Sequence, residues 1–130
     1  MSQHHHVVVL GASDKPDRFA YKAVRLLKHH GYDVTPVHPK LTETQDLQVA
    51  SSLSAISKPI DTLTLYVGPA RLLGMIEGIL AAKPARVIFN PGTESQELQT
   101  ALDQANIAWQ EDCTLVLFCL LYTSPSPRDA

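Results

Sequence analysis

The residues with the clearest potential for binding chemistry form a short loop near the start of the chain. Gly11, Ala12 and Ser13 follow directly after the apolar residues 7–10, and Arg18 stands a little further on. A loop of small residues between a strand and a helix exposes backbone N–H groups, and beside a cation it is typical of a phosphate-binding site. The same residues also fit a tight turn that binds nothing, and this stretch alone favours neither interpretation.

A second candidate site lies at the end of the next predicted strand, residues 32–40. Dinucleotide-binding units usually carry an Asp or Glu at this position for the ribose hydroxyls, but this chain carries His38, Pro39 and Lys40. A carboxylate is missing and a cation is present. The pattern therefore disfavours NAD and favours a ligand with an additional phosphate close to its ribose. The alternative is that Lys40 is a solvated loop lysine.

The sequence carries no recognisable pattern for catalysis or metal binding. Cys113 and Cys119 lack the spacing of metal ligands or of a redox pair, so we expect both to be small buried apolar residues. His38 is the only histidine at the predicted strand ends, where a histidine is more often structural than catalytic. We therefore predict no catalytic residue and no metal site, and we expect the protein not to be an enzyme.

Composition excludes several classes of partner. The formal net charge is −2, and 45% of the residues are hydrophobic and 18% charged, which is typical of an ordinary globular domain and not of a nucleic-acid-binding one. No apolar run reaches the roughly 20 residues that a membrane span needs, and the N-terminus lacks the order of a signal peptide. We expect a cytoplasmic protein with no nucleic-acid or membrane partner.

Strand and helix patterns alternate along the chain. Strands are predicted at residues 7–10, 32–40, 61–67, 85–89, 107–110 and 112–118, with a weaker one at 47–50 and a short helix or turn at 52–56. Longer helices are predicted between these strands. Such alternation predicts βαβ units with right-handed crossovers. The predicted fold class is α/β, a Rossmann-like three-layer fold with a mostly parallel sheet of five or six strands.

The helix starts are predicted from their capping residues. Pro16 suits the first helical position of the first helix, with Ser13 or Asp14 as its cap. Thr93 and Gln96 have the spacing of a capping box for the last helix.

Ligands of a parallel sheet bind at the carboxyl ends of its strands. Four predicted loops fall at that edge, at residues 11–18, 39–40, 67–69 and 90–92, and each contains Gly or Pro. Such residues let the backbone approach a ligand closely, although they also end strands in proteins that bind nothing.

Three segments are expected along the chain. Residues 1–6, with His4, His5 and His6, read as a flexible polar lead-in and not as a metal site. Residues 7–118 form the folded domain. Residues 119–130 are rich in Pro and Ser and are similar to an adapter-derived tail, so we expect this segment to be disordered or non-native.

Taken as an ordered set, the motifs resemble the CoA-binding domain proteins, small stand-alone relatives of the N-terminal domain of the succinyl-CoA synthetase alpha subunit. The resemblance covers roughly residues 7–117 and rests on Gly11, Ala12 and Ser13 with Pro16, Arg18 and Tyr21, on Gly31, Tyr32 and residues 34–40, and on residues 90–95 and 111–113. It implies that coenzyme A lies across the carboxyl ends of the strands. The diphosphate would lie at Gly11, Ala12, Ser13 and Arg18, the 3′-phosphate end at Pro39 and Lys40, and pantetheine along Val67, Gly68, Pro91 and Gly92.

The sequence and this resemblance together predict a protein that binds CoA or an acyl-CoA without chemistry of its own. Two alternatives stay open: an NADP- or nucleotide-dependent enzyme on the same fold, and a docking subunit for an acyl-CoA synthetase-type ligase. Assembly as a homo-oligomer is also open.

Overall fold

The computed structural model describes residues 5–45 and 47–114, in which strands and helices alternate as predicted. The strands are β1 His6–Leu10, β2 Asp33–Val37, β3 Glu43–Thr44, β4 Leu47–Gln48, β5 Thr62–Leu65, β6 Arg86–Phe89 and β7 Ala108–Glu111. The α-helices are α1 Phe19–His29, α2 Pro69–Leu72, α3 Ile76–Ala82 and α4 Gln96–Gln104, and single 3₁₀ turns occur at η1 Leu53–Ala55 and η2 Leu73–Met75. Within these ranges no helix is both long and apolar enough to cross a bilayer.

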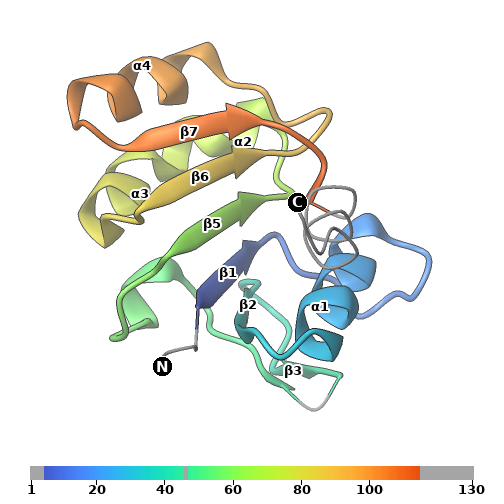
Figure 1. The fold of residues 1–130 in the computed structure, drawn as a ribbon. Coiled ribbons are helices and arrows are strands. Elements are labelled where there is room, and N and C mark those ends of the chain that lie inside the picture. Colours follow the sequence, from blue (N-terminus) through green and yellow to red (C-terminus); the bar gives the residue numbers. More distant parts are fainter. Residues whose placement is uncertain (1–4, 46, 115–130) are drawn as a thin grey trace, which may run out of the picture.

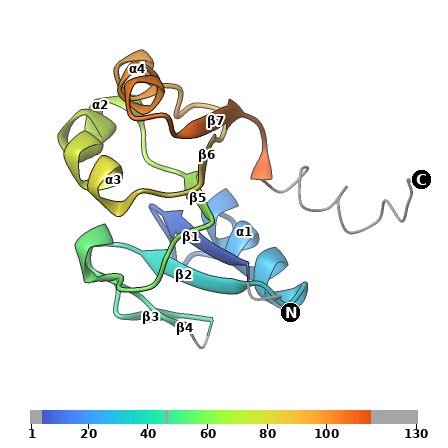
Figure 2. The same ribbon diagram turned by 60° about the vertical axis from the view of Figure 1, so that its left-hand side comes forward.

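The central element is a five-stranded sheet in the order β2-β1-β5-β6-β7, in which all neighbours are parallel. Helix α1 covers one face, and α2, α3 and α4 cover the other (Figures 1 and 2). Side chains that alternate along β1 point to these two layers: Val7 and Val9 pack with α1, whereas Val8 and Leu10 pack with the other helices. The predicted α/β Rossmann-like fold is confirmed.

The strand order creates a crevice next to β1. From β1 the chain crosses to β2 on one side, and the next long strand, β5, pairs with the other side of β1. The helices that follow β1 and β5 therefore leave the sheet on opposite faces. In sheets of this order the gap between these two carboxyl ends is the usual ligand site.

The first helix starts later than predicted. Pro16 lies in a turn in which the Arg18 amide donates to the Lys15 carbonyl at 3.0 Å, and α1 begins at Phe19 without a side-chain cap. Ser13 Oγ accepts from the Lys15 amide at 3.1 Å instead of capping the helix. The fixed φ of proline suits such a turn as well as a helix start. The way in which the apolar face of α1 packs on the sheet decides whether Pro16 lies in a turn or starts the helix.

The cap of the last helix also differs from the prediction. Ser95 is the N-cap of α4, and its Oγ accepts from the Leu98 amide at 3.3 Å. Thr93 is buried, and its hydroxyl donates to the Asn90 carbonyl at 2.8 Å. A local turn contact after β6 thus uses the side chain that the sequence pattern assigned to the cap.

The folded region begins earlier than predicted, because β1 starts at His6 and not at Val7. The His6 side chain is only 3% exposed. Its Nδ1 lies 2.7 Å from the Pro59 carbonyl and its Nε2 lies 2.7 Å from Thr35 Oγ1. A flexible lead-in that includes His6 is therefore wrong. A buried histidine with both nitrogens bonded is a structural residue.

The other predicted elements differ from the structure mainly in where they are interrupted or end. The weak predictions at residues 47–50 and 52–56 match β4 and η1, whereas the predicted helix after Gly68 is broken by η2 between α2 and α3. Helix α3 ends at Ala82, and the capping residue Lys83 is in the left-handed conformation. In the predicted strand at residues 112–118, Asp112 and Cys113 are outside any strand and Thr114 is helical. Residues 115–118 and the predicted tail at 119–130 lie outside the described residues.

Candidate functional site

A cavity of about 530 Å³ opens at the carboxyl ends of β1, β2 and β5, at the crevice that the strand order creates. Its walls come from the loops after these three strands, from the segment before η1 and from the α2–α3 segment. The lining residues are Leu10, Gly11, Ala12, Arg18, Val37, His38, Pro39, Ser51, Ser52, Leu53, Tyr66, Val67, Arg71, Gly74, Met75 and Gly78. This size is ordinary for a small-molecule or cofactor site.

Gly11 allows the loops after β1 and β5 to lie against each other. Its φ is +95°, and a Cβ placed there would lie 2.8 Å from Val67 Cγ2 and 2.9 Å from the Tyr66 carbonyl oxygen. Any side chain would therefore force the two loops apart and would also strain the backbone. The floor of the cavity requires glycine at this position.

The backbone of this loop is already engaged. The Gly11 and Ala12 amides both donate to the Val37 carbonyl, at 3.1 and 3.0 Å. The expectation that these two amides face a phosphate is therefore wrong, because they attach the loop to the end of β2. Of the side chains near this loop, Arg18 lines the cavity and Ser13 lines an adjoining hollow.

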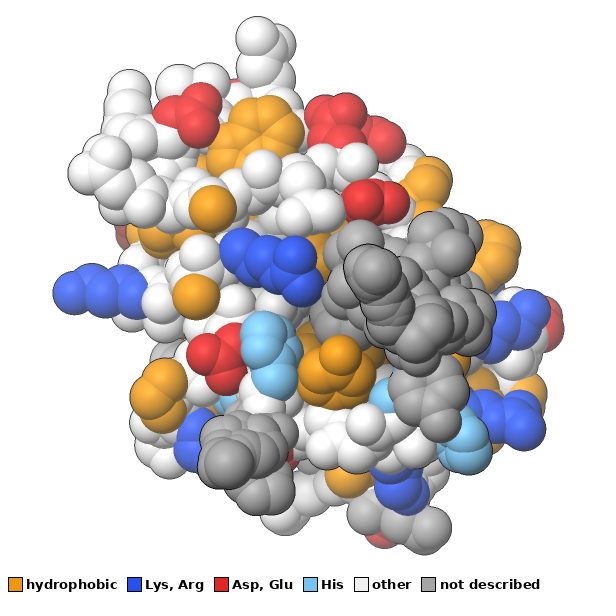
Figure 3. Space-filling view, viewed as in Figure 1, with side chains coloured by type: hydrophobic (Ala, Val, Ile, Leu, Met, Phe, Trp, Pro, Cys, Tyr) orange, Lys and Arg blue, Asp and Glu red, His pale blue; other side chains and the backbone are white. Residues whose placement is uncertain are grey.

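The cavity lining is positively charged. None of the lining residues is an Asp or Glu, whereas Arg18 and Arg71 are both present. Neither arginine makes a side-chain hydrogen bond or ion pair with another described residue. Carboxylates gather instead around α4 and β7, at the far end of the sheet (Figure 3). The crevice therefore favours an anionic ligand.

Tyr66 separates the cavity from a neighbouring hollow of about 310 Å³, which Ser13, Lys15 and Phe19 also line. The Tyr66 hydroxyl is buried near the Thr64 and Thr114 hydroxyls, but no hydrogen bond of good geometry joins it to another described residue. Burial is the main cause that raises the pKa of Tyr66 to about 12. The phenol is therefore protonated at neutral pH, and a buried donor without a partner suits a ligand acceptor.

His38 shapes the loop that follows β2. Its Nδ1 accepts hydrogen bonds from the Lys40 and Leu41 amides, at 3.0 and 3.1 Å. Through these two bonds the ring holds the turn in place. Lys40 itself lines a separate groove of about 670 Å³ along β2. Pro39 and Ser51 line both the groove and the cavity, so the two are adjacent.

The structure brings together some of the predicted site residues and leaves others apart. Gly11, Ala12, Arg18, Pro39 and Val67 line the cavity, Ser13 lines the hollow and Lys40 lines the groove. Gly68, Pro91 and Gly92 line none of these three. The end of β6, which carries Pro91 and Gly92, lies one strand further from the crevice than the end of β5.

Sequence reasoning missed the contribution of the α2–α3 segment. Arg71, Gly74 and Gly78 line the cavity, and a Cβ at either glycine would meet no atom within 4 Å. The available signal was the four-residue spacing of these glycines in a helix that starts at the binding edge of the sheet. Such spacing places both on one helix face.

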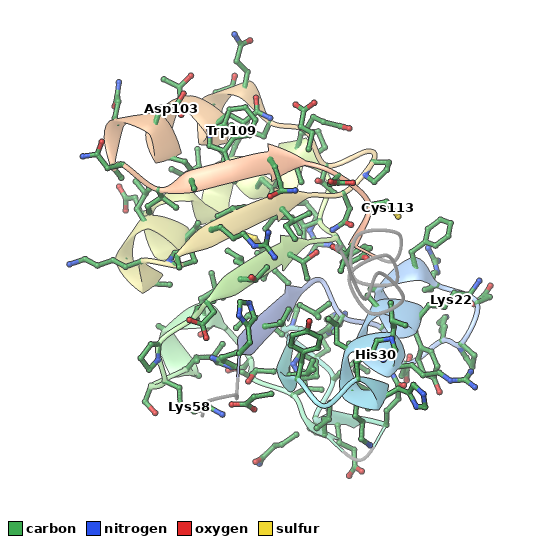
Figure 4. All side chains as sticks on the ribbon, in the orientation of Figure 1. Lys22, His30, Lys58, Asp103, Trp109 and Cys113 are labelled. Carbon is green, nitrogen blue, oxygen red and sulfur yellow. The ribbon has the colours of Figure 1, made fainter. Side chains whose placement is uncertain are left out.

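Metal-ligating side chains and cysteines are the remaining candidates for a chemical role. The described residues contain no group of three or more His, Cys, Asp or Glu side chains that could hold a metal ion. Cys113 follows β7 (Figure 4) and is partly exposed, not buried as expected. Cys119 lies outside the described residues.

Comparison with known proteins assigns the fold to a family. The family described as "CoA binding domain" matches residues 5–118. The chain belongs to the CoA-binding domain family. Among curated proteins it is 32% identical over 74 residues to an uncharacterized protein, YneT, of Bacillus subtilis (strain 168), a match that covers 57% of this chain and 55% of that relative. The matched region thus spans about half the length of the relative.

Solved structures extend this result for the CoA-binding domain. An uncharacterized protein is 37% identical with a TM-score of 0.84, covering 91% of this chain and 97% of that one. A Thermus thermophilus protein is 30% identical with a TM-score of 0.83, covering 88% and 87%. The dinucleotide-forming acetyl-coenzyme A synthetase 1 of Ca. Korarchaeum cryptofilum is 19% identical with a TM-score of 0.71, covering 81% of this chain and 25% of that one, and shares the fold.

Proposed function

We propose that this protein binds coenzyme A or an acyl-CoA in the cavity at the carboxyl ends of β1 and β5. The observation that carries the proposal is the acid-free lining, in which Arg18 and Arg71 stand beside the apolar side chains of Leu53, Val67 and Met75. Coenzyme A combines a diphosphate with a long arm of low charge, and this lining fits both properties. Membership of the CoA-binding domain family supports the same ligand.

The arrangement of the hollows supports an orientation for the ligand. The diphosphate lies beside the Gly11 loop and Arg18, and the adenosine extends past Pro39 and Ser51 towards the groove that holds Lys40. Because Pro39 and Ser51 line both this groove and the cavity, Lys40 is the cation that we assign to the 3′-phosphate. This contact is the one that would distinguish CoA from dephospho-CoA.

The pantetheine arm runs in the other direction. Tyr66 lines both the cavity and the neighbouring hollow, and Val67 lines the cavity beside it. The Tyr66 hydroxyl, which lacks a partner among the described residues, is available to donate to an amide carbonyl of the arm. Gly68 follows Val67 on this path, whereas Pro91 and Gly92 would meet only the far end of the ligand.

We infer that the protein acts by binding and not by catalysis. Among the described residues that line the cavity, the titratable groups are Arg18, His38, Tyr66 and Arg71. The Nδ1 atom of His38 is occupied by two backbone amides, and the raised pKa of Tyr66 leaves its phenol protonated at neutral pH. Neither group is therefore prepared to act as a general base.

Calorimetric titration with CoA, dephospho-CoA, NADP and NAD tests the proposal. We expect CoA to bind most tightly, and Lys40→Ala to weaken CoA by about 10-fold while leaving dephospho-CoA nearly unchanged. Arg25→Ala is the matched control, because Arg25 is exposed on α1 in a different hollow. Binding of NADP without binding of CoA would contradict the proposal and would favour the nucleotide-dependent enzyme. Co-purification with a larger catalytic chain would favour the docking subunit.

A further inference from the structure

Arg71 is a cavity residue to which neither the sequence motifs nor the family description assigns a role. It lies in α2 on the β5 side of the cavity, whereas Arg18 directly precedes α1 on the β1 side. Both side chains are exposed. Neither forms a hydrogen bond or ion pair with another residue in the described ranges, so no protein carboxylate there competes for them.

The two arginines belong to opposite layers of the fold. Helix α1 packs on one face of the sheet and α2 on the other (Figure 2), and Arg18 and Arg71 from these two segments line one cavity at the carboxyl ends of β1 and β5. An anion in the crevice would therefore meet positive charge from both layers. A guanidinium group offers paired donors that match the oxygens of a phosphate, which an ammonium group cannot do.

We propose that Arg71 and Arg18 hold the diphosphate of the ligand from opposite sides of the crevice, with Arg71 as a second diphosphate-binding residue. The identity of the full ligand as CoA rests on the proposed function. The diphosphate contact does not, since it requires no pantetheine and no 3′-phosphate. Binding joins the α1 layer to the α2 layer through the ligand.

The position of Lys40 separates its role from that of Arg71. Lys40 lines the groove beside β2 and is absent from the cavity lining, whereas Arg71 lines the cavity with Gly11 and Arg18. Arg71 therefore acts on every ligand that carries the diphosphate, and Lys40 acts only on ligands that carry the 3′-phosphate. A general loss of structure would not produce this difference in selectivity.

The test is a comparison of dissociation constants for CoA, dephospho-CoA and ADP in the wild type and in four variants. We expect Arg71→Ala to weaken all three ligands by about 10- to 100-fold and to leave the ratio between CoA and dephospho-CoA unchanged. Arg71→Lys keeps the charge but loses the paired donors, so it recovers part of the affinity. Lys40→Ala reduces the preference for CoA over dephospho-CoA, and Arg25→Ala leaves all three dissociation constants unchanged. Melting temperatures close to the wild type confirm that the variants fold.

The possible results separate this inference from the proposed function. If Arg71→Ala binds CoA and ADP as tightly as the wild type, the inference is overturned while CoA binding stands. If the wild type binds ADP in an Arg71-dependent way but does not bind CoA, the diphosphate contact holds and the proposed function fails. If the wild type binds neither ligand, both are overturned. A loss of affinity for CoA alone in Arg71→Ala also overturns the inference, because it assigns Arg71 to another part of the ligand.

Discussion

Replacing Gly11 with alanine is the sharpest test of how the cavity floor is built. At a φ of +95°, an L-residue is strained, and the added Cβ would lie 2.8 Å from Val67 Cγ2 and 2.9 Å from the Tyr66 carbonyl oxygen. Backbone strain contributes about 1–2 kcal/mol and overpacking about 1–3 kcal/mol. We expect Gly11→Ala to lose about 2–5 kcal/mol of unfolding free energy, a large part of the roughly 5–15 kcal/mol of a typical domain.

Gly92→Ala is the matched control for the clash. Gly92 has nearly the same φ, +93°, but a Cβ there would meet no atom within 4 Å. It should therefore show the backbone strain without the overpacking, at about 1–2 kcal/mol. Urea denaturation followed by circular dichroism measures both variants. If Gly11→Ala is no less stable than Gly92→Ala, the loops after β1 and β5 do not approach each other as the structure shows.

Three further predictions concern the cavity wall, the buried phenol and the first strand. Gly78→Ala should raise the unfolding free energy by about 0.5–1 kcal/mol, because helical glycine is unfavourable and the new Cβ meets no atom within 4 Å. Gly78→Leu should reduce CoA affinity without lowering the melting temperature, and undiminished affinity would argue against this wall as a ligand contact. The pKa of Tyr66 is raised from 10.0 to about 12, so the folded state keeps a proton that the unfolded state loses above pH 10. The wild type should therefore lose about 2–3 kcal/mol between pH 10 and pH 12 that Tyr66→Phe retains, and parallel pH profiles would refute the shift. His6→Ala should lower stability by about 2–4 kcal/mol, because it removes a buried side chain together with its hydrogen bonds to Pro59 and Thr35. A change below about 0.5 kcal/mol in chemical denaturation would show that the lead-in through His6 is dispensable.

The positions of the strand ends could be predicted from the sequence because they depend on local chemistry. Apolar runs that end in Gly or Pro mark where buried strands stop, and in a parallel sheet all such ends lie at one edge. Gly11, Pro39 and Val67 could be placed there from their positions after three strands, and the structure brings all three to one cavity. The cationic character of the site was also partly visible from Arg18.

The details that failed depend on which of several possible partners a polar side chain meets. Ser13 and Thr93 are good helix caps by residue type, yet Ser13 bonds the Lys15 amide and Thr93 bonds the Asn90 carbonyl. His6 resembles part of a polar tail until the positions of Thr35 and Pro59 are known. Several partners are available to each of these side chains, and only the packed structure determines which one is close.

The sequence by itself determined the class of this protein: an α/β domain whose strands end in Gly- or Pro-containing loops, with a lysine where NAD-binding units usually carry an acid. These properties follow from periodicity, turn residues and charge, which act over a few neighbouring positions. Only the tertiary structure decided that the Gly11 and Ala12 amides are already bonded to Val37 and that Arg71 faces the same cavity as Arg18. The physical reason is the strand order, which brings residues far apart in the chain to the two sides of one crevice.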